Sequence, residues 1–308
     1  MSIFSASRLR TLAVLLVAAW LVCGCNAAMR LAYENADTFL HWRALSYVPL
    51  NGKAADELDD RIDNFLAWHR AKALPQYARL SADAARRVKA GLSPADLVWG
   101  YDSFNAQARE SLREAAVQLA PMLDRLTPEQ ISHLEKRLAD DNRKFARDNR
   151  GSEKDRRNRR TRRMVDSLED WVGKLSKAQV ERVKQYAEHA PMMEELRERD
   201  RKRLQGDVLA IIRAREAQKR LPAYLEHWDS GRDPAVLAAN KAWRVELDKL
   251  LLDIDRTLTA EQRAKAVARL HGFSEDFSAL AVAAPAPAPV PAPVPVSVLT
   301  PGPDPLRQ

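Results

Sequence analysis

The chain of 308 residues has little cysteine and little glycine, and its proline is unevenly distributed. Its only two cysteines are Cys23 and Cys25. Cleavage of the chain between them would leave one cysteine and so exclude any disulfide within one chain. Nine of the 17 prolines lie between Pro285 and Pro305. No run alternates β-branched with polar residues as strands do, and Ala, Leu, Arg, Glu and Asp dominate the remainder. This composition predicts an all-α fold.

Sequence patterns of common catalytic sites are also missing. The six histidines show no H-E-x-x-H spacing, and there is no G-x-S-x-G or phosphate-binding loop. Residues 250–258 resemble the signature of haloacid-dehalogenase-type phosphatases, in which Asp253 would be the nucleophile and Asp255 the general acid. That signature ends a strand of an α/β fold, whereas its flanks here are helical in composition and Arg256 replaces the usual glycine. We therefore expect no enzymatic activity, no cofactor and no metal.

The N-terminus has the architecture of a bacterial secretion signal. Arg8 and Arg10 supply positive charge, and residues 11–22 form an apolar run too short to span a bilayer as a helix. Residues 22–25, Val-Cys-Gly-Cys, resemble the lipobox of bacterial lipoproteins, although Ala or Ser is usual at the second position. The resemblance implies that residues 1–24 are removed and that Cys25 carries lipid. An ordinary secretory signal and an uncleaved anchor are the alternatives.

The residue after the predicted lipid-bearing cysteine bears on location. By resemblance to lipoproteins of two-membrane bacteria, Asn26 in place of Asp implies transfer to the outer membrane. Three acyl chains would make such an anchor stable. We therefore expect an outer-membrane protein anchored by lipid on the periplasmic face, without nucleic acid as a partner.

The chain divides into three parts by composition. After the signal at 1–24, we expect a helical domain over 25–283 and a disordered Pro/Ala-rich tail over 284–308. Each proline of the tail removes a backbone donor and disfavours helix in the residue before it, so polyproline II is expected there. The tail would serve as a spacer or have no dedicated partner.

A short motif, Leu-[Ser/Thr]-x-x-Gln, recurs at 126–130, 175–179 and 258–262, with a looser copy ending in Asp at 92–96. A Ser or Thr at the N-cap accepts a hydrogen bond from the third helical amide, and the Gln or Asp there bonds back to the N-cap amide. The motif therefore predicts four helix starts. It also resembles the paired motif of small periplasmic stress chaperones, which implies an alternative function in binding unfolded clients.

These starts and the remaining helix breakers predict a multi-helix bundle of eight or nine helices. The tryptophans at 42, 68, 99, 171, 228 and 243 are expected to fill the seams between them. The expected helices lie near residues 28–47, 54–90 with an interruption at Pro75, 94–120, 128–150, 153–174, 177–190, 192–221, 235–256 and 260–282.

Several segments together resemble an uncharacterised family of proteobacterial lipoproteins known only as a domain of unknown function. They are Arg-Leu-Ala-Tyr-Glu-Asn-Ala-Asp at 30–37, Ala-Trp-His-Arg at 67–70, Leu-Pro-Gln-Tyr at 74–77 and Leu-Thr-Pro-Glu-Gln at 126–130. The similarity spans about residues 20 to 280. It implies a lipid-anchored helical protein and adds no catalytic residues.

Positive charge is concentrated in residues 143–163, where eleven Lys or Arg residues face only three acidic ones. Like charges at this density repel one another unless an anion or an acidic helix neutralises them. We expect an anionic lipid or lipopolysaccharide phosphate as the ligand, with a solvated helix or internal neutralisation by acidic residues at 55–63 as alternatives. The candidate anion-binding residues are Arg156, Arg157, Arg159, Arg160, Arg162 and Arg163.

Taken together, these observations predict a non-enzymatic adaptor or envelope-maintenance factor. The sequence does not identify a protein partner.

Overall fold

The structure is a computed structural model that describes residues 29–282. These residues form eleven α-helices and one π-helical turn, with no strand among them, which confirms the all-α prediction. The expected signal at 1–24, Cys25 and the tail at 284–308 lie outside the described residues. The bounds are α2 Ala36–Leu45, α3 Lys53–Trp68, η1 His69–Ala73, α4 Leu74–Ala90, α5 Pro94–Leu123, α6 Pro128–Asp148, α7 Glu153–Val172, α8 Lys177–His189, α9 Glu194–Arg213, α10 Ala217–Glu226, α11 Pro234–Thr257 and α12 Ala260–Val282.

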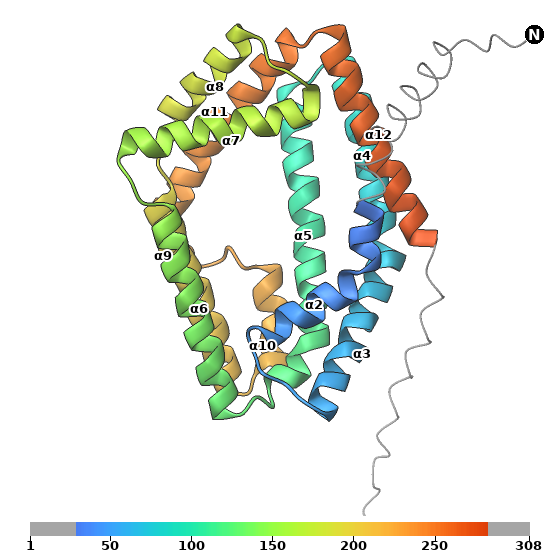
Figure 1. Cartoon of the computed structure of the whole chain (residues 1–308), viewed down its shortest axis with the longest axis vertical. Coiled ribbons are helices and arrows are strands. Elements are labelled where there is room, and N and C mark those ends of the chain that lie inside the picture. The colour runs from blue at the N-terminus through green and yellow to red at the C-terminus, as the bar shows by residue number, and fades with distance from the viewer. Residues whose placement is uncertain (1–28, 283–308) are drawn as a thin grey trace, which may run out of the picture.

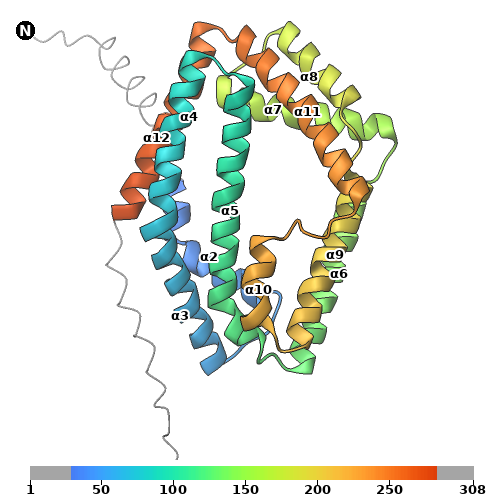
Figure 2. The same cartoon turned by 180° about the vertical axis from the view of Figure 1, so that it is seen from behind.

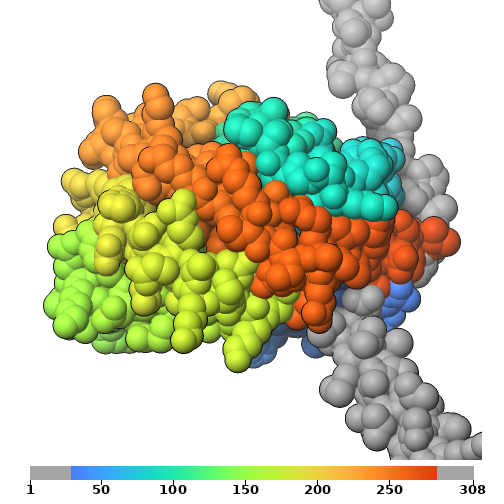
Figure 3. Space-filling view, turned by 90° about the horizontal axis from the view of Figure 1, so that it is seen from above, coloured from blue at the N-terminus to red at the C-terminus, as the bar shows by residue number. Residues whose placement is uncertain are grey.

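The helices are arranged along the sides of a frame (Figure 1). One side is the continuous rod of α3, η1 and α4, with α12 packed along α4, and the opposite side is the pair α6 and α9. Helices α7, α8 and α11 join these sides at one end. The view from behind shows α10 against the C-terminal half of α5 (Figure 2). Seen from above, α8, α11 and α12 form a continuous surface with the turn between α4 and α5 (Figure 3).

The number of helices exceeds the predicted eight or nine because two expected helices are divided. The expected helix at 54–90 is counted as two helices, α3 and α4, because the π-helical turn η1 lies between them. Residues 192–221 form α9 and α10, separated at Arg215, whose φ of 58° lies in the left-handed region. The amides of Arg215 and Glu216 donate to Ile212 and Ile211, at 3.0 and 3.2 Å, which is the Schellman pattern of a helix end. The N-terminus of α10 is then capped by a residue far away in the sequence. The Asp124 carboxylate accepts hydrogen bonds from the first two amides of that helix.

The interruption expected at Pro75 takes the form of a π-helical turn rather than a break. Pro75 has no amide to donate to Ala71, and its ring would crowd that carbonyl in a regular α-helix. The chain widens over His69–Ala73, and the Leu74 amide donates to the His69 carbonyl instead. Helices α3 and α4 therefore continue as one rod.

All four helix starts predicted from the repeated motif are confirmed. In α6 the Gln130 amide donates to Thr127 Oγ1 at 3.2 Å, and the Thr127 amide donates to Gln130 Oε1 at 2.9 Å. The same reciprocal pair starts α5, α8 and α12. A fifth capping box, Ser152 with Asp155, starts α7 and was not predicted, although its Ser-x-x-Asp spacing is visible in the sequence.

Two of these capping boxes bind each other. Gln179 Nε2 donates to Gln262 Oε1 at 3.1 Å, and Gln262 Nε2 donates to Gln179 Oε1 at 3.2 Å, in a buried contact. Each amide nitrogen also donates to a carbonyl two residues before the partner's cap, that of Thr257 at 3.2 Å or that of Lys174 at 2.9 Å. Each of the two glutamines therefore caps its own helix and also binds the start of the other helix.

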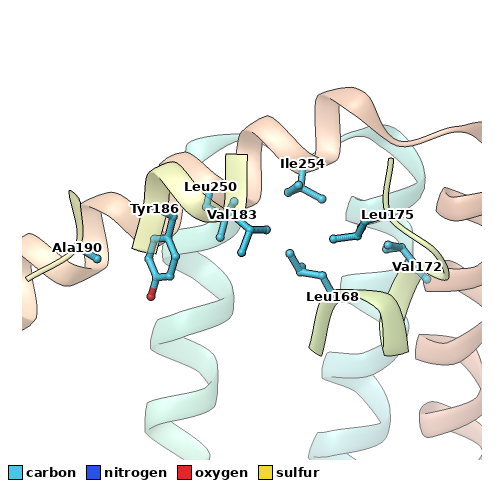
Figure 4. Packing of buried hydrophobic residues seen from close by; sticks show 9 residues of the cluster. Leu168, Val172, Leu175, Val183, Tyr186, Ala190, Leu250 and Ile254 are labelled. Carbon is cyan, nitrogen blue, oxygen red and sulfur yellow. The ribbon is translucent and has the colours of Figure 1, made fainter. Parts of the chain in front are cut away.

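Apolar residues of the described chain gather in four separate clusters, not in one central core. The largest lies beside the paired glutamines, where Leu168, Val183 and Ile254 of three different helices meet (Figure 4). The predicted packing of tryptophans in helix seams holds in part. Trp42 is 64% exposed, so the prediction is wrong there, whereas the other five are partly buried.

The paired glutamines give a test of stability. Gln179→Ala should lower the free energy of unfolding more than Gln130→Ala, by about 1–3 kcal/mol, because only the first leaves the buried Gln262 amide without its partner. Urea unfolding followed by circular dichroism measures both variants. Equal losses would show that the reciprocal amide pair contributes nothing beyond the capping that both glutamines provide.

Candidate anion-binding site

All six candidate arginines lie on α7, and the structure divides them between two faces. Residues three or four apart share one side of a helix. Arg157 and Arg162 lie along a groove toward α8. The other four line a pocket of about 540 Å³ between α7, α9, α11 and the end of α6. We call it the arginine pocket, and its cationic residues are Arg156, Arg159, Arg160, Arg163 and, from α9, Arg197.

Two of the six arginines hold the C-terminal end of α8. Arg157 Nη1 donates to the Ala187 carbonyl at 2.7 Å, and Arg160 donates to the carbonyls of Ala190 and Pro191 at 2.7 and 3.0 Å. The last carbonyls of a helix lack intrahelical donors and carry partial negative charge, so a guanidinium is well matched to them. Burial lowers the pKa of Arg160, and the nearby Glu194 carboxylate opposes that effect.

The remaining arginines of the pocket are less completely matched. Arg159 donates to the Arg150 carbonyl at 2.7 Å and thereby supports the turn before α7. Arg156 Nε is buried and has no hydrogen-bond partner among the described residues. Arg163 is exposed, and within residues 29–282 no carboxylate oxygen lies within 4.0 Å of its guanidinium. Arg163 is therefore accessible to a ligand, and Arg156 Nε has an unused hydrogen-bond donor.

The carboxylates of the pocket do not balance its positive charge. Five arginines face only Asp148 and Glu194. Glu194 Oε1 lies 3.9 Å from Arg160, and Glu194 Oε2 is buried without a hydrogen-bond partner in the described chain. Buried polar atoms are normally satisfied by hydrogen bonds. The pocket therefore presents an unmatched donor, an unmatched acceptor and a net positive charge.

The aromatic side chains in its walls limit contact with water. Phe145, Tyr186 and Trp243 line the pocket, and Arg197 lies 5.8 Å from the Trp243 ring in a cation–π arrangement. Burial raises the pKa of Tyr186, so its phenol stays neutral at physiological pH. A partly desolvated site strengthens the attraction between arginine and an anion.

A neighbouring pocket of about 580 Å³ shares Arg197 and Trp243 with the arginine pocket but has a different charge balance. Arg109 donates to both carboxylate oxygens of Asp229, at 2.9 and 2.7 Å, and this bond lowers the pKa of Asp229. Two more of its arginines are paired, Arg232 with Asp200 and Arg244 with Asp248. The unmatched positive charge therefore belongs to the arginine pocket.

The phosphatase-like string is part of helix α11, not the end of a strand. The Asp255 carboxylate accepts hydrogen bonds from the Leu92 amide at 2.9 Å and from Arg263 at 2.8 Å. Asp253 pairs with Arg182. Two residues apart on a helix, the carboxylates point to different sides. Both make structural contacts that the sequence motif does not reveal.

A polar pair inside an aromatic cluster was also not found from the sequence. Tyr33 Oη lies 2.8 Å from His69 Nδ1, among the rings of Phe65, Trp68 and Tyr77. Burial lowers the pKa of His69 and raises that of Tyr33 to about 12, so both are neutral at physiological pH. Residues 29–282 contain no group of three or more His, Cys, Asp or Glu side chains placed to hold a metal ion.

Residues 46–231 match the model of a family of unknown function, DUF6279, and the match covers more than half of the chain. The chain belongs to this family. The expected membership of an uncharacterised family is thereby confirmed, over a shorter span than expected. The match contains α7 and ends before Trp243 of the arginine pocket. No curated protein and no solved structure matches the chain significantly.

In the part of the chain that the structure describes, no helix has the length and apolar character needed to cross a membrane.

The different contacts of Arg160 and Arg163 predict different effects on stability. Arg160→Ala should lower the free energy of unfolding by about 1.5–3 kcal/mol, because charged donors are lost from the end of α8. Arg163→Ala is the matched control and should change it by less than about 0.5 kcal/mol. Chemical denaturation of both variants measures the difference. Similar values would mean that Arg160 does not support α8.

Proposed function

We propose that the protein is a lipoprotein of the proteobacterial outer membrane that binds a phosphate-bearing ligand in the arginine pocket without transforming it. Such a protein would act as an adaptor or envelope-maintenance factor on the periplasmic face. The observation that carries the proposal is the unmatched positive charge of the pocket, where five arginines face two carboxylates.

The unmatched atoms of the pocket indicate the chemistry of the ligand. Phosphate oxygens are strong acceptors for guanidinium groups and would satisfy Arg156 Nε. The buried Glu194 Oε2 needs a donor, which phosphate does not supply. A headgroup with both phosphate and hydroxyl groups would satisfy both atoms. Phosphatidylglycerol and the phosphorylated sugars of lipopolysaccharide have this combination.

The N-terminal side of the described chain supports membrane anchoring. Met29, the first described residue, follows the predicted lipid-bearing Cys25 by four positions. Leu31, Phe39 and Trp42 are 61%, 60% and 64% exposed. Aromatic side chains such as Trp are favoured at the boundary between lipid and water. Together with the lipobox resemblance, this exposed apolar surface supports an anchor at Cys25.

A second candidate function is chaperone-like binding of unfolded clients, and α5 carries the observation that favours it. Val98, Tyr101 and Phe104 lie on the exposed side of α5, with Leu237 and Val245 of α11 also exposed. Contiguous exposed apolar surface often marks a site of interaction. Phe104→Ser should reduce suppression of client aggregation if the chaperone hypothesis is right, and it should leave phosphate binding unchanged.

Lipidation of Cys25 is tested by the mass of the mature protein. Mass spectrometry of the membrane fraction should find an N-terminus at Cys25 carrying acyl groups, because the lipobox resemblance places cleavage after Gly24. Cys25→Ala should leave the precursor uncleaved. An unmodified N-terminus at a later residue would exclude the lipid anchor.

Ligand binding is tested with phosphatidylcholine vesicles that contain phosphatidylglycerol or lipopolysaccharide. The mature chain with Cys25→Ser, which cannot be lipidated, should cosediment with these vesicles and not with pure phosphatidylcholine. Binding should weaken as ionic strength rises to about 0.15 M, where the Debye length falls to about 8 Å. Reversing Arg156, Arg159 and Arg163 to Glu should lower the affinity about tenfold or more.

The groove on the other face of α7 supplies a control with the same change in net charge. Lys154, Arg162 and Lys184 line that groove, and reversing these three to Glu should have a much smaller effect. Equal losses in the two triple variants would indicate attraction to the surface as a whole. Such a result would refute ligand binding in the arginine pocket.

A further inference from the structure

A second, apolar pocket lies away from the arginines of α7. It has a volume of about 460 Å³ and is formed by the loop between α2 and α3, the end of α5 and the beginning of α6. Its walls are mostly aliphatic, and Tyr47 is the only aromatic residue that lines it within the described part of the chain. The main apolar wall residues are Leu58, Leu119, Met122, Leu126 and Leu134. Pockets of this size and composition are typical of sites for small apolar ligands.

Polar contacts hold the segments around the apolar pocket in place. Arg125 of the loop after α5 donates to both carboxylate oxygens of Glu57 on α3, at 2.5 and 2.6 Å. Gln130 Nε2 donates to the Pro49 carbonyl of the α2–α3 loop at 3.0 Å. These contacts join α3 to α5, and the α2–α3 loop to α6, at the rim. The pocket is therefore formed before any ligand binds.

Two apolar clusters meet at the pocket without filling it. Leu58 and Met122 belong to the cluster of α3 and α5, and Leu126 belongs to the cluster of α6 and α9. The half-buried Leu50 contacts both clusters. Apolar surface left between two clusters gains free energy when a ligand removes it from water.

Charge at the rim indicates the head of the ligand. Hydrogen bonds from Arg61 and Arg125 lower the pKa of Glu57, and the carboxylate is thus already matched by guanidinium groups. Lys53 lines the same pocket, is exposed and has no carboxylate oxygen within 4.0 Å in the described part of the chain. The rim therefore offers one unmatched cation beside an aliphatic interior.

We propose that this pocket binds one long-chain fatty acid, with its acyl chain between the leucines and its carboxylate paired with Lys53. The aliphatic walls favour a flexible hydrocarbon chain over a flat aromatic ring. The volume lies in the lower half of the range for small-molecule sites, about 300–1,000 Å³, which favours a single chain over a two-chain lipid. This site is separate from the arginine pocket and goes beyond the proposed function.

Equilibrium dialysis with radiolabelled palmitate tests the proposal on the mature chain with Cys25→Ser. Ala54 lines the pocket, so Ala54→Trp should fill it and weaken palmitate binding about tenfold or more. Lys53→Glu, on the exposed rim, avoids disturbing the apolar walls. It should weaken binding of palmitate but not of its neutral methyl ester. Lys219→Glu, on an exposed position of α10, is the control with the same charge change and should bind both normally.

The outcomes separate this site from the arginine pocket. Reversal of Arg156, Arg159 and Arg163 should leave palmitate binding unchanged, so failure of one proposal does not imply failure of the other. Absence of palmitate binding to the unaltered pocket would overturn the proposal. So would equal effects of Lys53→Glu and Lys219→Glu, or equal weakening of palmitate and its ester by Lys53→Glu.

Discussion

The contact between Gln179 and Gln262 joins the N-terminal ends of α8 and α12. Each glutamine caps its own helix through Oε1 and also donates to the other glutamine and to a carbonyl near the other cap. A buried amide left without partners would cost about 1–3 kcal/mol, so both helix starts must be formed together for either to be satisfied. The contact therefore ties the position of α8 to that of α12.

The position of α8 in turn divides the arginines of α7. Because the C-terminal end of α8 lies against α7, Arg157 and Arg160 supply donors to its last carbonyls. The guanidinium groups of these two residues therefore bind backbone carbonyls within the fold. Arg156 and Arg163 have no such carbonyl at the end of α8, and they remain on the side that faces Arg197 of α9. The arginine-rich segment of α7 therefore has two roles in the structure: some of its arginines bind the end of α8, and some line the arginine pocket.

The division of the apolar residues into several clusters explains why apolar surface remains accessible away from the arginines of α7. Helices that pack mainly in pairs around a frame leave seams at their corners, and the apolar pocket lies at one of them. The Arg125–Glu57 salt bridge and the hydrogen bond from Gln130 to the Pro49 carbonyl join the segments at its rim. Long helices such as α5 also expose apolar side chains, Val98 and Phe104 among them, where no neighbouring helix covers them. Charge and apolar surface therefore occur in different places and suit ligands of different chemistry.

The sequence by itself determined the all-α fold and four helix starts, because capping by Thr127 or Ser176 involves atoms only three residues apart. Membership of an uncharacterised family was likewise visible in short local segments. The sequence also located the dense arginines, and its prediction of a lipid anchor at Cys25 concerns a residue outside the described structure. Tertiary structure alone decided that α10 begins at a cap supplied by Asp124, more than 90 residues earlier in the chain. It also decided which arginines share a pocket, because that depends on contacts between residues far apart in sequence, which local hydrogen bonding and periodicity do not specify.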